Sequence, residues 1–149
     1  MTFKEKIYSG CVQLIRNKIG LLQNALADLK QSASNETKST AGDKHETALA
    51  MLQIEQENIN KQLTDALAQK LVLVKIDPAV RPVKIVNGSL VKTNKGYFFL
   101  SVALGKIVAD EVTVIALSPQ SPLGIKLMGL KENDSVIMNG TSYIIESIE

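Results

Sequence analysis

Two regular series of apolar positions at helical spacing run through the first half of the chain. The first series lies between Phe3 and about Ala33, with alternating steps of four and three residues, which is the heptad pattern of a helix that packs along one stripe. The second resumes after Asp43 and ends at Lys70 with the same steps; it is weaker because Gln56 and Lys70 are polar. The members of the two series are Tyr8, Val12, Ile15, Ile19, Leu22, Leu26, Leu29 and Ala33, and then Leu49, Leu52, Gln56, Ile59, Leu63, Ala66 and Lys70. The pattern predicts two long helices, each with one apolar seam.

The segment between the two series is polar. Gln31 to Thr40 is rich in Ser, Asn and Thr, which is typical of a loop. Two seams of similar length joined by a short polar segment predict an antiparallel coiled-coil hairpin over residues 1–75, with an acidic tip near residues 39–47.

The second half of the chain reads differently. Pro78 and Pro82 end the helical pattern and mark a linker. Asn139-Gly140 is a strong signal for a two-residue hairpin, and Ser121-Pro122 suits the start of a short helix that Gly129 would end. The expected strands are Val83–Val86, Ser89–Thr93, Tyr97–Val102, Glu111–Ile115, Ser135–Met138 and Thr141–Ile148. The fold class is therefore α+β, with a small, mainly antiparallel sheet domain and one short helix over residues 76–149.

Composition and charge narrow the range of functions. The 149 residues include 17 basic and 15 acidic side chains, a net charge of +2, so neither half is a basic module for bare nucleic acid. One Cys and one His leave no Cys/His zinc cluster, and the lone Cys11 fits a reducing cytosol and buried helix packing. We find no signal peptide and no apolar run long enough to span a membrane. We therefore expect a cytoplasmic protein that binds a protein partner or contributes to a composite site.

The tip of the predicted hairpin carries Asp43 and Glu46, three residues apart. An Asp at the helix start with a Glu three residues later resembles a capping box, in which the side chains satisfy free backbone amides. Exposed carboxylates could instead hold a divalent cation such as Mg²⁺, which prefers oxygen ligands, although two carboxylates need further ligands from a partner. The local sequence leaves both interpretations open.

The short helix near residue 123 also has two interpretations. Its apolar residues either pack on the sheet or form a docking patch. Aromatic residues make up only 4% of the chain and Trp is absent, so we expect no aromatic-lined pocket and no prolyl isomerase activity.

Two segments together resemble the bacterial Gre transcript-cleavage factors. Gly42-Asp43-Lys44-His45-Glu46-Thr47-Ala48 is similar to the tip motif Gly-Asp-x-x-Glu-Asn-Ala of that family. The run from Ser118 to Gly129, Ser-Pro-Gln-Ser-Pro-Leu-Gly-Ile-Lys-Leu-Met-Gly, followed by Asp134 and Val136, is similar to the family's C-terminal signature.

The resemblance implies a coiled-coil hairpin that enters the secondary channel of RNA polymerase and an FKBP-like domain that docks at the channel rim. It implies that Asp43 and Glu46 help hold an Mg²⁺ ion shared with the polymerase, which then cuts backtracked RNA near its 3′ end. It also places Ser121, Pro122, Leu123 and Gly124 at or near the docking surface. The factor would be an activator with no active site of its own and no sequence-specific DNA binding.

The chain departs from the family motif just after the tip acids. Thr47 stands where the family has Asn, Leu49-Ala50-Met51 replace its Glu-Tyr-His, and Ile54 replaces an Arg. These changes favour an alternative in which the protein binds the channel as an inhibitor or regulator without stimulating cleavage. A general coiled-coil interaction module is a third interpretation.

Overall fold

The structure is a computed structural model that describes the backbone of residues 1–37 and 42–149, and the side chains of these ranges outside residues 36–45. The chain forms two compact units. One unit combines Met1–Leu14 with Leu71–Glu149 and holds the sheet, so we call it the β-rich unit. The other, Ile15–Lys70, is the helical unit.

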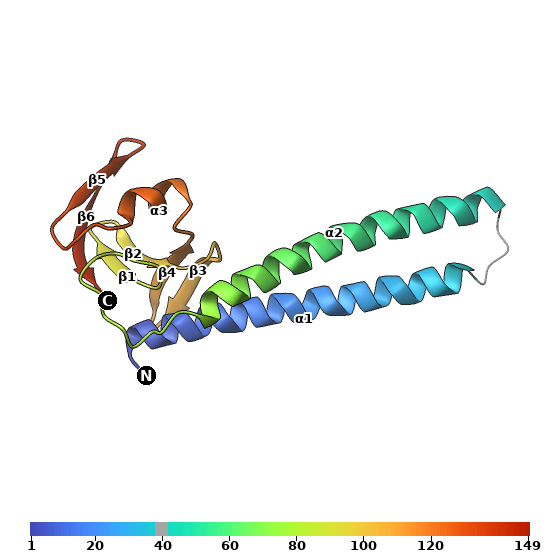
Figure 1. Ribbon diagram of the computed structural model, residues 1–149, viewed down its shortest axis with the longest axis horizontal. Helices are drawn as coiled ribbons and strands as arrows, with labels where there is room; N and C mark the ends of the chain where they lie inside the picture. The colour runs from blue at the N-terminus through green and yellow to red at the C-terminus, as the bar shows by residue number, and fades with distance from the viewer. Residues whose placement is uncertain (38–41) are drawn as a thin grey trace. The chain divides into compact units, whose positions relative to one another are not determined.

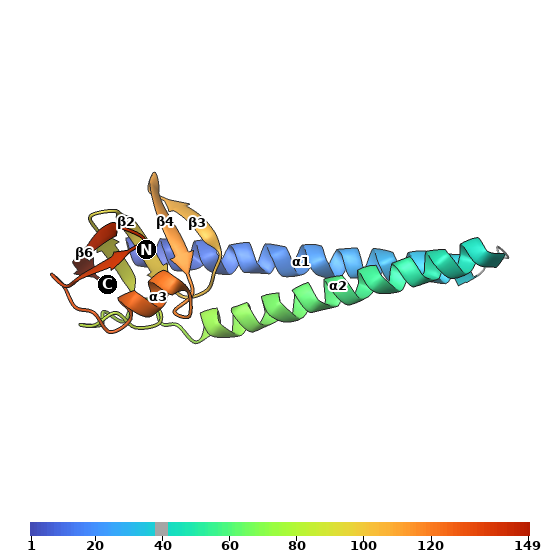
Figure 2. The same ribbon diagram turned by 90° about the horizontal axis from the view of Figure 1, so that it is seen from above.

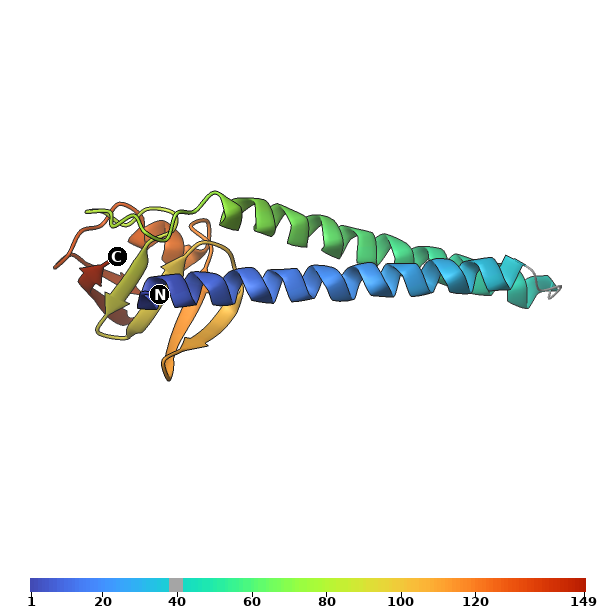
Figure 3. The ribbon, with the colours of Figure 1, turned by 90° about the horizontal axis from the view of Figure 1, so that it is seen from below.

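Two long helices account for the first half of the chain, as predicted. α1 spans Phe3–Thr37 and α2 spans Gly42–Val74, and the two run in opposite directions (Figures 1 and 3). Every member of the two apolar series is buried or half-buried; Ile15 and Ala66 are fully buried, while Leu21, just off the seam, is 71% exposed. The heptad pattern therefore identified the side chains that are withdrawn from water.

The predicted loop from Gln31 to Thr40 was too long, because α1 continues to Thr37. Ser, Asn and Thr each cost well under about 1 kcal/mol in a helix interior relative to Ala, which a long, already nucleated helix tolerates. Ala33 is half-buried, so the seam extends into the beginning of the polar segment.

A single six-stranded sheet forms the centre of the β-rich unit. Its strands are β1 (Leu90–Thr93), β2 (Gly96–Leu100), β3 (Gly105–Ala109), β4 (Val112–Leu117), β5 (Ser135–Met138) and β6 (Thr141–Ile148). Their order is β3-β4-β2-β1-β6-β5, and every neighbouring pair is antiparallel except β2 and β4, which are parallel. The short helix α3 (Pro122–Leu127) lies between β4 and β5 in the chain (Figure 1). The α+β fold class is confirmed.

Two of the strand predictions need correction. Val83–Val86 is not a strand: Ile85 exchanges backbone hydrogen bonds with Leu130 and Gly129, at 2.9 and 2.8 Å, and the residues beside it do not extend the ladder. β3 was missed, although Figure 2 shows it beside β4. The turn joining β3 to β4 has positive φ at Asp110 (51°) and Glu111 (63°), a conformation that sequence patterns associate with Asn-Gly or Asp-Gly.

The remaining turn signals are confirmed. Asn139 and Gly140 both have positive φ, 50° and 77°, as a type I′ turn between β5 and β6 requires. Ser121 is the N-cap of α3 and Pro122 is its first residue. Gly129, with a φ of 84°, follows shortly after the helix end.

Both faces of the sheet are covered within the β-rich unit. On one face, α3 and the chain around Ile85 enclose a core. On the other face lies the first part of α1: the rings of Phe3 and Tyr97 meet edge-to-face at 5.5 Å, and Gly10 approaches Ile107 so closely that a Cβ would lie 2.9 Å from its Cγ2. The buried residues of the first core are Ile85, Val91, Phe98, Leu100, Leu117, Leu127 and Ile145. None of the helices in the described ranges is long and apolar enough to cross a bilayer.

A side-chain hydrogen bond within this unit also holds the C-terminal end of α2. The Tyr8 hydroxyl donates a 2.8 Å hydrogen bond to the carbonyl of Leu73 in the last turn of α2. The same carbonyl accepts the Ile76 amide at 3.0 Å, so the Tyr8 hydroxyl adds a second hydrogen bond at the C-terminal end of α2.

Cys11 is buried in the β-rich unit, and its environment makes a specific prediction. Burial raises the pKa of the thiol to about 12 from 9.0, so at neutral pH the thiolate fraction falls about a thousandfold. We expect a thiol reagent to label the native protein far more slowly than the urea-unfolded chain. Because the folded pKa is raised, the stabilisation from Cys11 is complete below pH 9 and declines as the pH rises toward 12. Cys11→Ala should remove that alkaline decline; equal labelling of the folded and unfolded chains would contradict the assignment.

Candidate functional site

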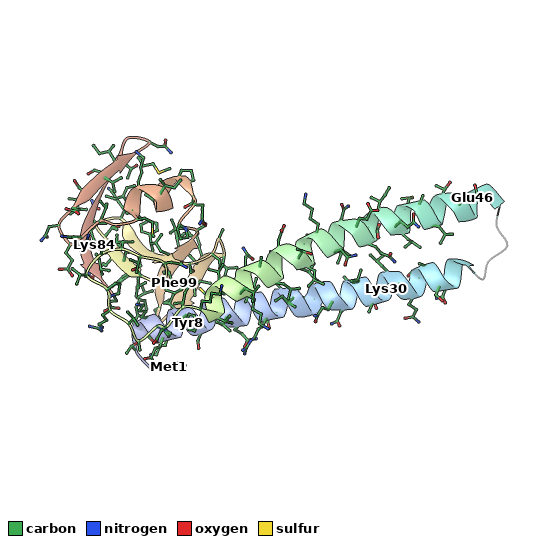
Figure 4. All side chains as sticks on the ribbon, in the orientation of Figure 1. Met1, Tyr8, Lys30, Glu46, Lys84 and Phe99 are labelled. Atoms are coloured by element: carbon green, nitrogen blue, oxygen red, sulfur yellow. The ribbon has the colours of Figure 1, made fainter. Side chains whose placement is uncertain are left out.

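The predicted tip acids lie at the beginning of α2. The helix starts at Gly42, so Asp43 and Glu46 both fall within its first two turns, where a negative charge interacts favourably with the helix dipole. The Glu46 side chain is exposed, and Figure 4 shows it near the N-terminal end of α2. The Asp43 and His45 side chains lie outside the described residues, so capping by Asp43 stays a prediction.

The donor set near the tip limits what this chain could offer a metal ion. Among the residues whose side chains are described, no group of three His, Cys, Asp or Glu side chains is placed to hold a metal. An Mg²⁺ ion requires a near-octahedral set of oxygen ligands and usually keeps several waters. Two carboxylates alone would supply only part of such a set.

Two of the residues that depart from the Gre-like motif are exposed apolar side chains on α2. Met51 is 60% exposed and Ile54 is 57% exposed, and their spacing of three residues places them on the same side of α2. Leu49 is half-buried, as expected for its place in the seam. α2 thus presents two exposed apolar side chains where the resemblance implies polar ones.

A network of short hydrogen bonds fixes the loop before α3. The Ser121 hydroxyl donates to the Ser118 carbonyl at 2.6 Å and accepts the Gly124 amide at 3.1 Å. The Ser118 hydroxyl donates to the Gln120 side chain at 2.6 Å and accepts the Gln120 amide at 3.1 Å. The two serines of the Ser-Pro-x-Ser-Pro run thus hold the loop in one conformation and begin the helix.

Gly124 fits this loop because it has no side chain. A Cβ at this position would lie 2.1 Å from the Ser118 carbonyl oxygen and 2.8 Å from the Ser121 hydroxyl. Gly124 is buried, whereas Pro122 is exposed and Ser121 and Leu123 are half-buried. Of the four predicted docking residues, three therefore reach the surface, and Gly124 allows the close turn beneath them.

These three residues border an apolar hollow of about 460 Å³, which we call the α3 hollow. The rings of Phe98 and Tyr143 meet edge-to-face at 5.9 Å at its wall, so the expectation that no aromatic-lined pocket exists was wrong. The lining residues are Lys95, Phe98, Ile115, Leu117, Ser121, Pro122, Leu123, Met138 and Tyr143. The lining of the hollow is mostly apolar, and among the described residues Lys95 is the one basic residue in it.

The sequence interpretation missed the sheet residues of this hollow for an identifiable reason. Strand alternation does place Phe98 and Leu100 on one face, and the Asn139-Gly140 turn does bring Met138 close to Thr141. The parallel pairing of Phe98 with Ile115, which completes the wall, joins strands that are not consecutive in the chain. A local pattern carries no information about such a pairing.

Comparison with known proteins adds a structural likeness. No family model and no curated protein matches the chain. The chain is similar to the solved structure of the transcription factor Gfh1, with 14% sequence identity over 93% of both chains and a TM-score of 0.38. Similarity at this level does not establish a shared function.

Proposed function

We propose that this protein is a Gre-like transcription elongation factor that binds RNA polymerase at its secondary channel. The observation that carries the proposal is the pairing of two motif-like segments in the expected order, each with fitting local chemistry. The first segment supplies Asp43 and Glu46 at the start of α2. The second supplies the Ser-Pro loop that borders the α3 hollow.

The chemistry at the tip would depend on carboxylate oxygens. Asp43 and Glu46 would provide oxygen ligands from one helical turn to an Mg²⁺ ion that the polymerase also binds. A divalent ion at such a site lowers the pKa of bound water and stabilises the charge that develops during phosphodiester hydrolysis. This chain would contribute only the two ligands and their position, so cleavage would remain a reaction of the polymerase.

The docking chemistry would be largely apolar. The α3 hollow offers two aromatic rings and aliphatic side chains within a rigid loop and sheet, which suits an apolar anchor from a partner protein. Lys95 at its edge could pair with an acidic group of that partner.

A second candidate function has its own supporting observation. Met51 and Ile54 are exposed where the Gre family has polar residues. Without those polar groups the tip could still occupy the channel, and the protein would then inhibit or regulate the polymerase without stimulating cleavage.

A backtracked elongation complex with end-labelled RNA distinguishes the two functions at matched Mg²⁺ concentration. If the tip holds the metal, the wild-type protein should accelerate RNA shortening, and Asp43→Ala/Glu46→Ala should reduce the acceleration by at least about tenfold, since even the outer partners of metal ligands are worth that much. Glu55→Ala/Glu57→Ala is the matched control, because it removes two exposed carboxylates from the same helix.

Each variant must first bind polymerase as tightly as the wild type does. Binding without any acceleration by the wild type would support the inhibitor or regulator. A protein that neither binds polymerase nor changes the behaviour of a stalled complex would contradict both functions.

A further inference from the structure

Lys4 is buried in an unusual way for a lysine. The residue is only 4% exposed, and its ammonium donates a 2.6 Å hydrogen bond to the carbonyl oxygen of Val80. Lysines usually bury their aliphatic stem and keep the charged group in water. An ammonium has three N–H donors, and the Val80 carbonyl is the one acceptor that the described part of the chain places within hydrogen-bonding distance.

A hollow of about 260 Å³ lies beside this ammonium, which we call the Lys4 hollow. Its lining also includes a second basic residue, Lys75, one acidic residue, Asp77, and aliphatic side chains. The aliphatic side chains are those of Ile76, Val80, Pro82 and Val86. Val80 and Val86 are 54% and 43% exposed, so the hollow presents apolar surface to solvent next to a buried positive charge. The volume is below the usual range for drug-sized ligands, about 300–1,000 Å³, and suits a small molecule.

The charges around Lys4 compensate its ammonium only from a distance. Desolvation lowers the pKa of Lys4 from 10.5, the carboxylates of Glu149 and Asp77 oppose that change, and the Arg81 guanidinium adds to it. Neither carboxylate forms a direct ion pair with Lys4 in the described part of the chain; Glu149 approaches Arg81 instead, at 3.7 Å. A buried charge without a direct partner is costly, and an anion that enters the hollow would relieve the cost.

We propose that the Lys4 hollow binds a small branched-chain carboxylate. Its carboxylate oxygens pair with the ammonium groups of Lys4 and Lys75, and its aliphatic body lies against Ile76, Val80 and Val86. A carboxylate fits better than a phosphate because Asp77 also lines the hollow and repels a doubly charged group more strongly, and because the aliphatic walls would desolvate that group without compensation. The proposal does not depend on polymerase binding.

Binding at this site has a second consequence that a purely structural lysine would not show. A carboxylate beside Lys4 favours its charged form, so the pKa of Lys4 should rise when the ligand binds. By linkage, the affinity for the carboxylate should fall as the pH rises past the pKa of Lys4 in the free protein.

The test uses the full chain and isovalerate as the probe, followed by the NMR signals of the Asn87 and Gly88 amides, which line the hollow. We expect saturable shifts with isovalerate and none with the neutral isovaleramide. Lys4→Met should weaken binding at least about tenfold, the usual effect of losing a charge-assisted hydrogen bond. Lys106→Met, which removes an exposed lysine outside the hollow, should leave the affinity unchanged.

Three results would overturn the proposal: no saturation by isovalerate, equal binding of isovaleramide or inorganic phosphate, or unchanged affinity in Lys4→Met. If Lys4→Met does not fold, the test uses the wild-type protein only. Saturating isovalerate must then raise the pKa of the Lys4 ammonium measured by NMR titration, and a constant pKa contradicts the site.

Discussion

Replacing Gly124 with alanine should lower the free energy of unfolding of the β-rich unit by about 3 kcal/mol. The added Cβ would lie 2.1 Å from the Ser118 carbonyl oxygen, which is backbone, so the loop itself must move. Overpacking of this kind costs about 1–3 kcal/mol and sometimes more. Here the movement also disturbs the Ser121 cap, which is worth about 1 kcal/mol. For a unit of this size we expect the midpoint of thermal unfolding to fall by roughly 12–24 °C.

The measurement can be restricted to the unit that carries the substitution. All three tyrosines, Tyr8, Tyr97 and Tyr143, belong to the β-rich unit, so tyrosine fluorescence follows its unfolding. Gly20→Ala is the opposite control, since nothing lies within 4 Å of the added Cβ. Far-UV circular dichroism should show it stabilising α1 by up to about 1 kcal/mol. A Gly124→Ala protein as stable as the wild type would mean that the loop adapts without cost.

The contrast between these two glycines marks what a sequence can and cannot predict. Gly20 interrupts a helical pattern, and its modest cost follows from helix propensity alone. The requirement for glycine at position 124 arises from a backbone oxygen six residues earlier, which approaches only because the Ser-Pro loop folds back. Local residue preferences predicted the helix start at Ser121, but the need for glycine at position 124 follows only from the folded geometry of the loop.

The same distinction explains the errors in the fold and at the site. The heptad series, the α3 cap and the Asn139-Gly140 turn depend on nearby residues, and each was predicted correctly. β3 was missed because its turn uses Asp110 and Glu111 at positive φ, where no glycine marks the conformation. The α3 hollow was missed because β2 pairs with β4 across intervening chain. The tip acids were identified from a motif, and the role that we propose for them needs a partner molecule that no local pattern describes.

Introducing a carboxylate into the α3 hollow should weaken binding to core RNA polymerase by about 10- to 30-fold. Leu123→Asp places a charge among Phe98, Tyr143 and their neighbours, where an apolar anchor of the partner would have to desolvate it. A loss of about 2 kcal/mol, typical of a buried interface residue, corresponds to about 30-fold in affinity. The affinity is best measured by competition with a labelled wild-type protein.

Two further variants separate docking from folding. Ile125→Asp is the matched control, because Ile125 lies on the same helix, is 64% exposed and does not line the hollow, so polymerase binding should be unchanged. Leu123 also packs against the core, so Ile115→Asp, at a lining residue that is 40% exposed, tests the hollow with less effect on stability. The tip variant Asp43→Ala/Glu46→Ala should bind as the wild type does, because the proposed docking surface lies in α3 and the sheet. If both lining variants fold and bind polymerase normally, docking must occur elsewhere on the chain, and the apolar pair Met51 and Ile54 becomes the next surface to test.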